Sequence, residues 1–103
     1  MDDVRIFRGC LVADLVLPHA RSLKDRRGPL RALLQRLRNH GHAVAQVGPS
    51  DLTQRAFLAV VAVSGSESQL TGLLDGAERI LYASEFEVAD LRRDVTSVSH
   101  PSL

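Results

Sequence analysis

The alternation of apolar and polar residues marks the first element of the chain. Between Arg5 and Leu17, apolar residues recur at every second position on one face, among them Phe7, Leu11 and Leu15. Successive side chains of a strand point to opposite faces, so a period of two residues is typical of a β-strand. Pro18 ends the pattern. We therefore predict a strand over residues 5–17.

Leucines at helical spacing then predict a helix from Leu23 to Asn39. Ser22 precedes this segment as an N-cap, Asp25 completes a variant of the capping box, and Gly41 provides a C-terminal stop. Pro29 lies inside the segment, where a proline lacks the amide donor and clashes with the preceding turn. The helix is therefore either kinked near residues 26–28 or begins again at Pro29. The phase of the leucines favours the kink.

The rest of the chain predicts two more strands, a second helix and a last strand. Residues 43–47 form a short strand, and residues 54–63 form a long strand that is apolar on both faces, as in the centre of a sheet. Ser66 and Gln69 form a capping box before a leucine-rich helix that reaches Leu81. Residues 84–95 form the last strand, with a phase shift near Ala89 that indicates a bulge. We therefore predict a single domain over residues 1–95 and a flexible tail over residues 96–103.

The order strand, helix, strand, strand, helix, strand predicts an α+β fold of the ferredoxin-like βαββαβ type. Two right-handed crossovers place both helices on one face of a four-stranded antiparallel sheet. The other face is left open, and one of two apolar rows of the 54–63 strand, Ala56/Leu58/Val60 or Phe57/Ala59/Val61, should line it. A contiguous apolar patch is rare on a monomer. We therefore predict a homodimer, through the sheet face or its edges, with the interface residues Cys10, Val12, Val16, Leu58 and Val60.

The net charge is only +1, but ten basic residues stand against five acidic ones up to Arg55, and three against seven afterwards. On a helical wheel, four cations of the first helix lie within about 60° of one another. Regularly spaced cations suit a phosphate backbone. The candidate nucleic-acid-binding residues are Lys24, Arg27, Arg31 and Arg38. A solvated helix face, or ion pairs with the acidic half of a partner, are the alternatives. Since there is no Trp and only one Tyr, no aromatic platform for RNA bases is predicted.

Other candidate chemistry is sparse. The lone Cys10 excludes an internal disulfide, fits a reducing cytosol and is interpreted as a small hydrophobic residue rather than a nucleophile. His40 and His42 have no cysteine or acidic neighbour at ligand spacing, so we predict neither a metal nor a cofactor. At the turn before the long strand, Asp51, Gln54 and Arg55 form a candidate site for a polar ligand, although Asp51 capping the turn is the simpler interpretation.

The chain has no apolar run long enough to cross a membrane, and its N-terminus is acidic where a signal peptide would be basic. We therefore expect a cytoplasmic protein that does not contact the membrane.

The string Ser22-Leu23-Lys24-Asp25-Arg26-Arg27, together with Val44-Ala45-Gln46-Val47 and Gln54-Arg55-Ala56, resembles the YlxP-like family of small bacterial proteins of unknown function. The resemblance implies a ferredoxin-like fold and a role linked to RNA or the ribosome, with no established catalytic residues. Gly28-Pro29 and Gln46 depart from the family pattern and indicate a divergent member.

We therefore predict a non-enzymatic binding module. The alternatives are a small-molecule-binding protein or cofactor-free enzyme in a biosynthetic pathway, with its pocket at the open sheet face or dimer interface, and a pure interaction subunit.

Overall fold

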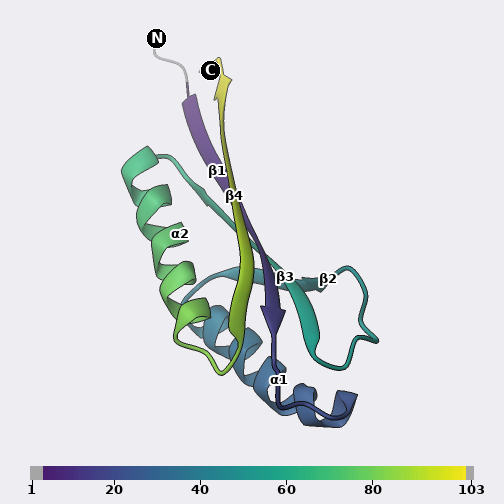
Figure 1. The fold of residues 1–103 in the computed structure, drawn as a ribbon. Helices are drawn as coiled ribbons and strands as arrows, with labels where there is room; N and C mark the ends of the chain where they lie inside the picture. The colour runs from purple at the N-terminus through teal and green to yellow at the C-terminus, as the bar shows by residue number, and fades with distance from the viewer. Residues whose placement is uncertain (1–3, 102–103) are drawn as a thin grey trace.

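The computed structural model describes residues 4–101. It contains β1 (Val4–Val16), α1 (Leu23–Asn39), β2 (Ala43–Val47), β3 (Arg55–Ser64), α2 (Glu67–Tyr82) and β4 (Glu87–His100). The strands form one antiparallel sheet in the order β2-β3-β1-β4. Both helices lie on the same side of this sheet (Figure 1). The predicted ferredoxin-like α+β fold is confirmed.

The core lies between the helices and the sheet. Leucines from β1, β3 and both helices are completely or almost completely buried there: Leu11, Leu15, Leu37, Leu58, Leu70, Leu74 and Leu81. Gly9 of β1 lies where α2 comes closest to the sheet, since a Cβ atom at this position would be 2.6 Å from Cδ1 of Leu74. A larger residue there would force the Leu74 side chain to move, because a packed core has little room for added atoms.

The register of β3 decides which of its two apolar rows faces the helices. Leu58 pairs with Ala13 and Val60 with Leu11, and all four side chains are fully buried. The assignment of Leu58 and Val60 to an exposed interface is therefore wrong. The open face instead carries Phe57, Ala59 and Val61. Both rows are apolar because β3 is a central strand, so the residue pattern itself did not distinguish them.

α1 runs without interruption through Pro29, so the first turn is not a separate element. Its predicted N-terminal cap is confirmed: Ser22 Oγ accepts the Asp25 N–H at 3.2 Å, and the Asp25 carboxylate accepts the Arg21 N–H at 2.9 Å. At the other end Gly41 adopts a φ of 85°, and the His42 N–H bonds to the Leu37 carbonyl at 3.0 Å. This pattern is a Schellman motif, and it turns His42 back beneath the helix end.

β4 is longer than the sequence predicted. The bulge is confirmed at Ala89, which is skipped between the pairs Asp14–Asp90 and Leu15–Val88. The prediction of a tail from Thr96 is wrong for residues 96–100, which pair with residues 4–8 of β1; residues 102–103 lie outside the described part. Because β3 ends opposite Phe7, the ends of β1 and β4 form a two-stranded ribbon. Figure 1 shows this ribbon projecting past α2.

Candidate functional site

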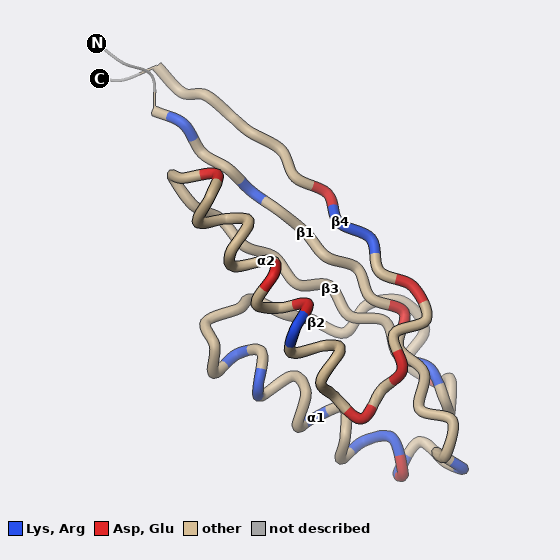
Figure 2. Tube along the Cα trace, turned by 60° about the vertical axis from the view of Figure 1, so that its left-hand side comes forward, with Lys and Arg blue, Asp and Glu red and all other residues tan. Residues whose placement is uncertain are grey.

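Four cations lie on the exposed surface of α1, as the helical wheel predicted. Leu30, Leu33 and Leu37 pack against the sheet, and the exposed row beside them consists of Lys24, Arg27, Arg31 and Arg38. We call these four residues the α1 basic stripe. Figure 2 shows the concentration of basic residues along α1. Asp25 is the only acidic residue of this helix.

The α1 basic stripe has no carboxylate partner within residues 4–101. The ion pairs there involve arginines of the sheet instead: Arg55 with Asp14, Arg92 with Asp90, and Arg93 with Asp75 and Glu78. The Asp75 and Glu78 carboxylates raise the pKa of Arg93, with the hydrogen bond to Asp75 as the largest cause. Thus several of the acids in the second half of the chain neutralise cations of the sheet, while α1 keeps its positive charge.

Arg26 is a structural residue that the sequence analysis did not single out. Its side chain is only 6% exposed. Nη1 donates to the carbonyl oxygens of Leu52, at 3.0 Å, and Arg55, at 2.6 Å, and Nη2 donates to that of Ser50, at 3.0 Å. The guanidinium thereby ties α1 to the loop between β2 and β3. The helical wheel contained a signal for this role, since Arg26 lies on the same face as the buried leucines.

Two residues of the predicted Asp51/Gln54/Arg55 cluster, Gln54 and Arg55, bind other parts of the fold. Gln54 Nε2 donates to the carbonyls of Pro18 and Ala20, at 3.0 and 3.1 Å, and so holds the loop that follows β1. Arg55 makes two hydrogen bonds to Asp14, which raise the pKa of Arg55. Asp51 is exposed. Ligand binding by this cluster stays a prediction.

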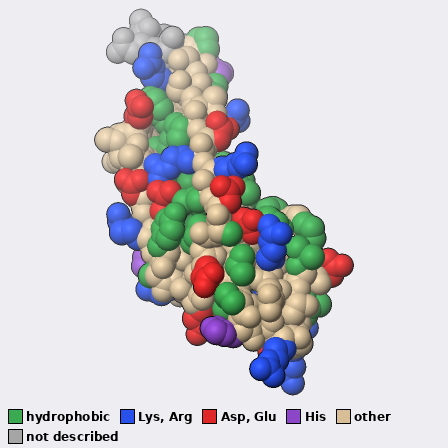
Figure 3. All heavy atoms as spheres, viewed as in Figure 1, with side chains coloured by type: hydrophobic (Ala, Val, Ile, Leu, Met, Phe, Trp, Pro, Cys, Tyr) green, Lys and Arg blue, Asp and Glu red, His purple; other side chains and the backbone are tan. Residues whose placement is uncertain are grey.

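The open face of the sheet is apolar at its centre. Val12 is 40%, Val61 49% and Val63 64% exposed, whereas Cys10 and Val16 are half-buried. In the view of Figure 3, apolar side chains are interspersed with charged ones along the sheet. The hollow beside Cys10 has a volume of only about 150 Å³. Metabolite sites usually measure roughly 300–1,000 Å³, so this hollow is small for one.

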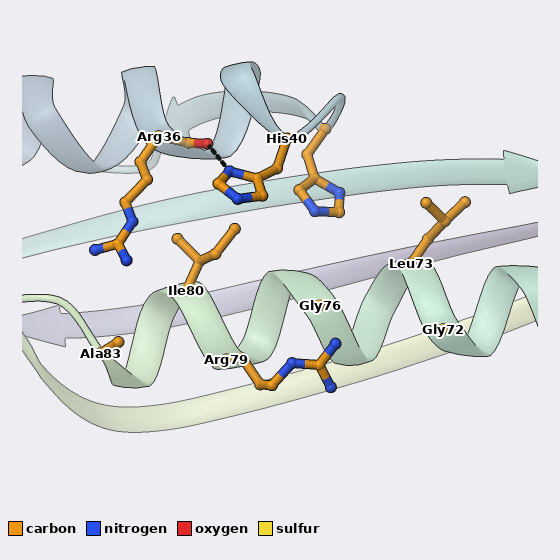
Figure 4. Close-up of a pocket in the computed structure, with 9 residues that line it drawn as sticks. Arg36, His40, Gly72, Leu73, Gly76, Arg79, Ile80 and Ala83 are labelled. Atoms are coloured by element: carbon orange, nitrogen blue, oxygen red, sulfur yellow. Dashed lines mark hydrogen bonds between the residues drawn. The ribbon is translucent and has the colours of Figure 1, made fainter.

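A larger groove separates the two helices. It measures about 430 Å³ and is lined by three residues from the end of α1 and the following turn, Arg36, His40 and His42, and by the α2 residues Gly72, Leu73, Gly76, Arg79 and Ile80 with Ala83. Figure 4 shows Arg36 and His40 extending from α1 towards α2. The sequence analysis considered His40 and His42 as metal ligands, and His40 also as a favourable partner of the helix dipole at the end of the first helix. It missed the groove because its two walls lie about forty residues apart in the chain.

His42 is 7% exposed, and burial lowers its pKa below the usual 6.5, with a further contribution from His40. The unfolded chain therefore binds a proton more readily than the folded chain. As the pH falls below about 6.5, the folded state loses stability until the pH reaches the lower pKa of folded His42.

His42→Gln should therefore flatten the dependence of the free energy of unfolding on pH below about 6.5, as measured by urea denaturation at a series of pH values. An identical slope in His42→Gln and the unchanged protein would contradict this assignment.

No group of three or more His, Cys, Asp or Glu residues within residues 4–101 is placed to hold a metal ion. Within the same residues, no helix is long and apolar enough to cross a membrane.

A comparison with curated proteins found no match. Residues 9–93 match the family model described as "Protein of unknown function (DUF503)". They comprise most of β1, all of α1, β2, β3 and α2, and the first half of β4. The match leaves out the outer end of the β1–β4 ribbon. Because it covers more than four fifths of the sequence, the chain belongs to the DUF503 family.

Proposed function

We propose that this protein is a non-enzymatic module that binds the phosphate backbone of RNA through the α1 basic stripe. The observation that carries the proposal is that four exposed cations lie in one row along α1 and that none of them forms an ion pair within residues 4–101. The ion pairs there belong to Arg55, Arg92 and Arg93 of the sheet. Cations without an ion-pair partner keep their full attraction for phosphates. Their binding also releases counterions from the nucleic acid, and the entropy of these released ions favours the complex.

The string from Ser22 to Arg27 supports a finer placement, as a divergent YlxP-like protein that associates with RNA or the ribosome in the cytoplasm. In this string Ser22 and Asp25 cap the helix and Arg26 anchors it. Lys24 and Arg27 are left on the surface. The fixed helix start thus presents two cations in a defined orientation, as backbone recognition requires.

Charge reversal tests the proposal. Arg27→Glu/Arg31→Glu should lower the affinity for a short single-stranded RNA at least tenfold. It should also reduce the slope of log affinity against log salt, which is about −0.7 per neutralised phosphate. Fluorescence anisotropy at several salt concentrations measures both quantities.

The control, Arg5→Glu/Arg92→Glu, makes the same change in net charge on β1 and β4 and should have a much smaller effect. Equal losses in both double variants would show attraction by net charge alone and overturn the assignment to α1. Salt-independent or absent RNA binding by the unchanged protein would overturn the function.

We also propose that a second copy of the chain covers the open face. Val12, Val61 and Val63 are exposed on adjacent strands, and the small side chains of Ala43, Ala45 and Ala59 beside them allow close approach of another sheet. A patch of this kind is self-complementary across a two-fold axis. A stable monomer in sedimentation at tens of micromolar would contradict the homodimer.

The alternative function, a small-molecule or cofactor-free enzyme pocket on the open face, has less support in a single copy of the chain. Its hollow beside Cys10 has about 150 Å³, against about 430 Å³ for the groove between the helices. A ligand of metabolite size therefore fits the groove between the helices better than the hollow beside Cys10.

A further inference from the structure

We infer that the groove between α1 and α2 binds a phosphomonoester of metabolite size, whose phosphate is attracted by the two arginines that line the groove, Arg36 and Arg79. This site is separate from the α1 basic stripe and does not depend on the proposed RNA binding. Arg36 follows Arg31 by five residues, or about 140° on the wheel, so it lies on the flank of α1 that faces α2.

The charge of the groove favours an anion. Arg36 and Arg79 are exposed at the last turns of the two helices, and neither has a carboxylate partner within residues 4–101. Figure 4 shows Arg36 reaching towards α2 and Arg79 lying along α2 beside Gly76. Their position at helix ends offsets the helix dipoles, but it leaves their N–H groups available to a ligand. The adjoining hollow contains one acid, Glu85, which does not line the groove itself.

Two glycines keep the α2 wall of the groove open. A Cβ at Gly72 would meet nothing within 4 Å, and one at Gly76 would meet only the Arg79 side chain, at 3.7 Å. Neither glycine has a positive φ. Each glycine weakens a helix by about 1 kcal/mol relative to alanine, and neither backbone conformation nor packing requires it here. Their effect is to widen the groove and expose the helix backbone beside Arg79.

His42 adds a polar group that has no partner in the protein. Its side chain is 7% exposed and lines the groove. Its backbone N–H bonds to Leu37, but its ring makes no hydrogen bond to any residue between 4 and 101. Neither ring nitrogen is fully buried and unpaired, so the ring keeps access to the groove. A ligand oxygen in the groove would accept a hydrogen bond from this ring.

The donor set and the shape together select the class of ligand. Two guanidinium groups and an imidazole on opposite walls suit the three terminal oxygens of a phosphate better than a single planar carboxylate, which one arginine can satisfy. Arg36 and Ala83 also line a second hollow of about 460 Å³, whose wall includes Pro29, Ala32 and Leu33. An apolar body attached to the phosphate would lie there.

Phenyl phosphate and inorganic phosphate are suitable probes for a titration followed by ¹H–¹⁵N NMR. Both should shift the amides of Gly72, Gly76 and Arg79 in a saturable way, and phenyl phosphate should bind several-fold more tightly because its ring buries apolar surface. Arg36→Gln/Arg79→Gln should weaken binding at least tenfold. The control Lys24→Gln/Arg27→Gln removes the same charge from the α1 basic stripe and should retain phosphate binding.

Gly72→Leu supplies a test without any change in charge. The new side chain enters open space, so the fold should be retained while the groove is filled and phenyl phosphate binding falls at least tenfold. Three results would each overturn the site. The first is unaltered phenyl phosphate binding by Gly72→Leu, and the second is an equal loss of binding in Arg36→Gln/Arg79→Gln and in Lys24→Gln/Arg27→Gln. The third is the absence of saturable shifts in the unchanged protein. Loss of RNA affinity only in Lys24→Gln/Arg27→Gln would separate this site from the proposed function.

Discussion

Arg26→Met should lower the free energy of unfolding by about 3 kcal/mol, because methionine removes three hydrogen bonds from a charged group and leaves three carbonyl acceptors without their donor. These acceptors belong to Ser50, Leu52 and Arg55, at distances of 2.6–3.0 Å from the guanidinium nitrogens. Methionine retains most of the apolar stem, so the loss reports on the hydrogen bonds rather than on a cavity. Urea denaturation followed by circular dichroism measures it, and a melting temperature lower by roughly 4–8 °C per kcal/mol should accompany it.

Arg27→Met is the matched control, since it removes the same group from the next position of the same helix. Arg27 is exposed and belongs to the α1 basic stripe, so the free energy of unfolding should change by less than about 0.5 kcal/mol. The effects on RNA affinity should be the reverse of those on stability. Arg27→Met should weaken RNA binding, whereas Arg26→Met should leave it unchanged under conditions in which the protein is folded. Equal stabilities of the two variants would contradict the anchoring role of Arg26.

The sequence predicted well those features that depend on neighbouring residues. The capping of α1 by Ser22 and of α2 by Ser66, the stop at Gly41 and the bulge at Ala89 all appear in the structure. Each is an interaction between residues a few positions apart. The α1 basic stripe belongs to the same class, because the geometry of a helix alone places its four members on one side.

Features that depend on distant residues were predicted less well. The strand character of residues 96–100 depends on pairing with residues 4–8, almost the whole chain away, and a weakly apolar segment gives no local sign of it. Arg26 illustrates the same limit: its partners lie 24–29 positions further along the chain. The lack of ion pairs on α1 within the described residues could not be predicted either. It depends on which arginines the aspartates and glutamates contact in the fold, and these arginines belong to the sheet.

The two walls of the inter-helix groove show why the site was harder to predict than the fold. His40, His42, Gly72 and Gly76 each have an ordinary local explanation as capping, turn or helix-weakening residues. Only the antiparallel packing of α1 and α2 brings them around one cavity. A fold of this kind can therefore be derived from patterns, whereas its sites arise from the contacts between elements.

Leu58→Asp should unfold the protein or lower its free energy of unfolding by roughly 4 kcal/mol or more, because it places an unpaired carboxylate in the core. Leu58 is 0% exposed and packs under the helices, while Val61 on the same strand is 49% exposed on the open face. Val61→Asp introduces the same group three residues away and should change the stability of the isolated chain by less than about 1 kcal/mol. Denaturant titration of both variants, with sedimentation of Val61→Asp, measures the contrast.

The pair also bears on the proposed homodimer. If a second copy covers the open face, Val61→Asp should remain folded but sediment as a monomer, because the new carboxylate would be buried against the partner without a charge to pair with it. A folded, stable Leu58→Asp would contradict the register of β3 and with it the whole assignment of faces. A dimer that persists in Val61→Asp would leave the fold intact and place the contact between copies elsewhere. The outer edge of β4 is the next candidate, since no strand within residues 4–101 pairs with it.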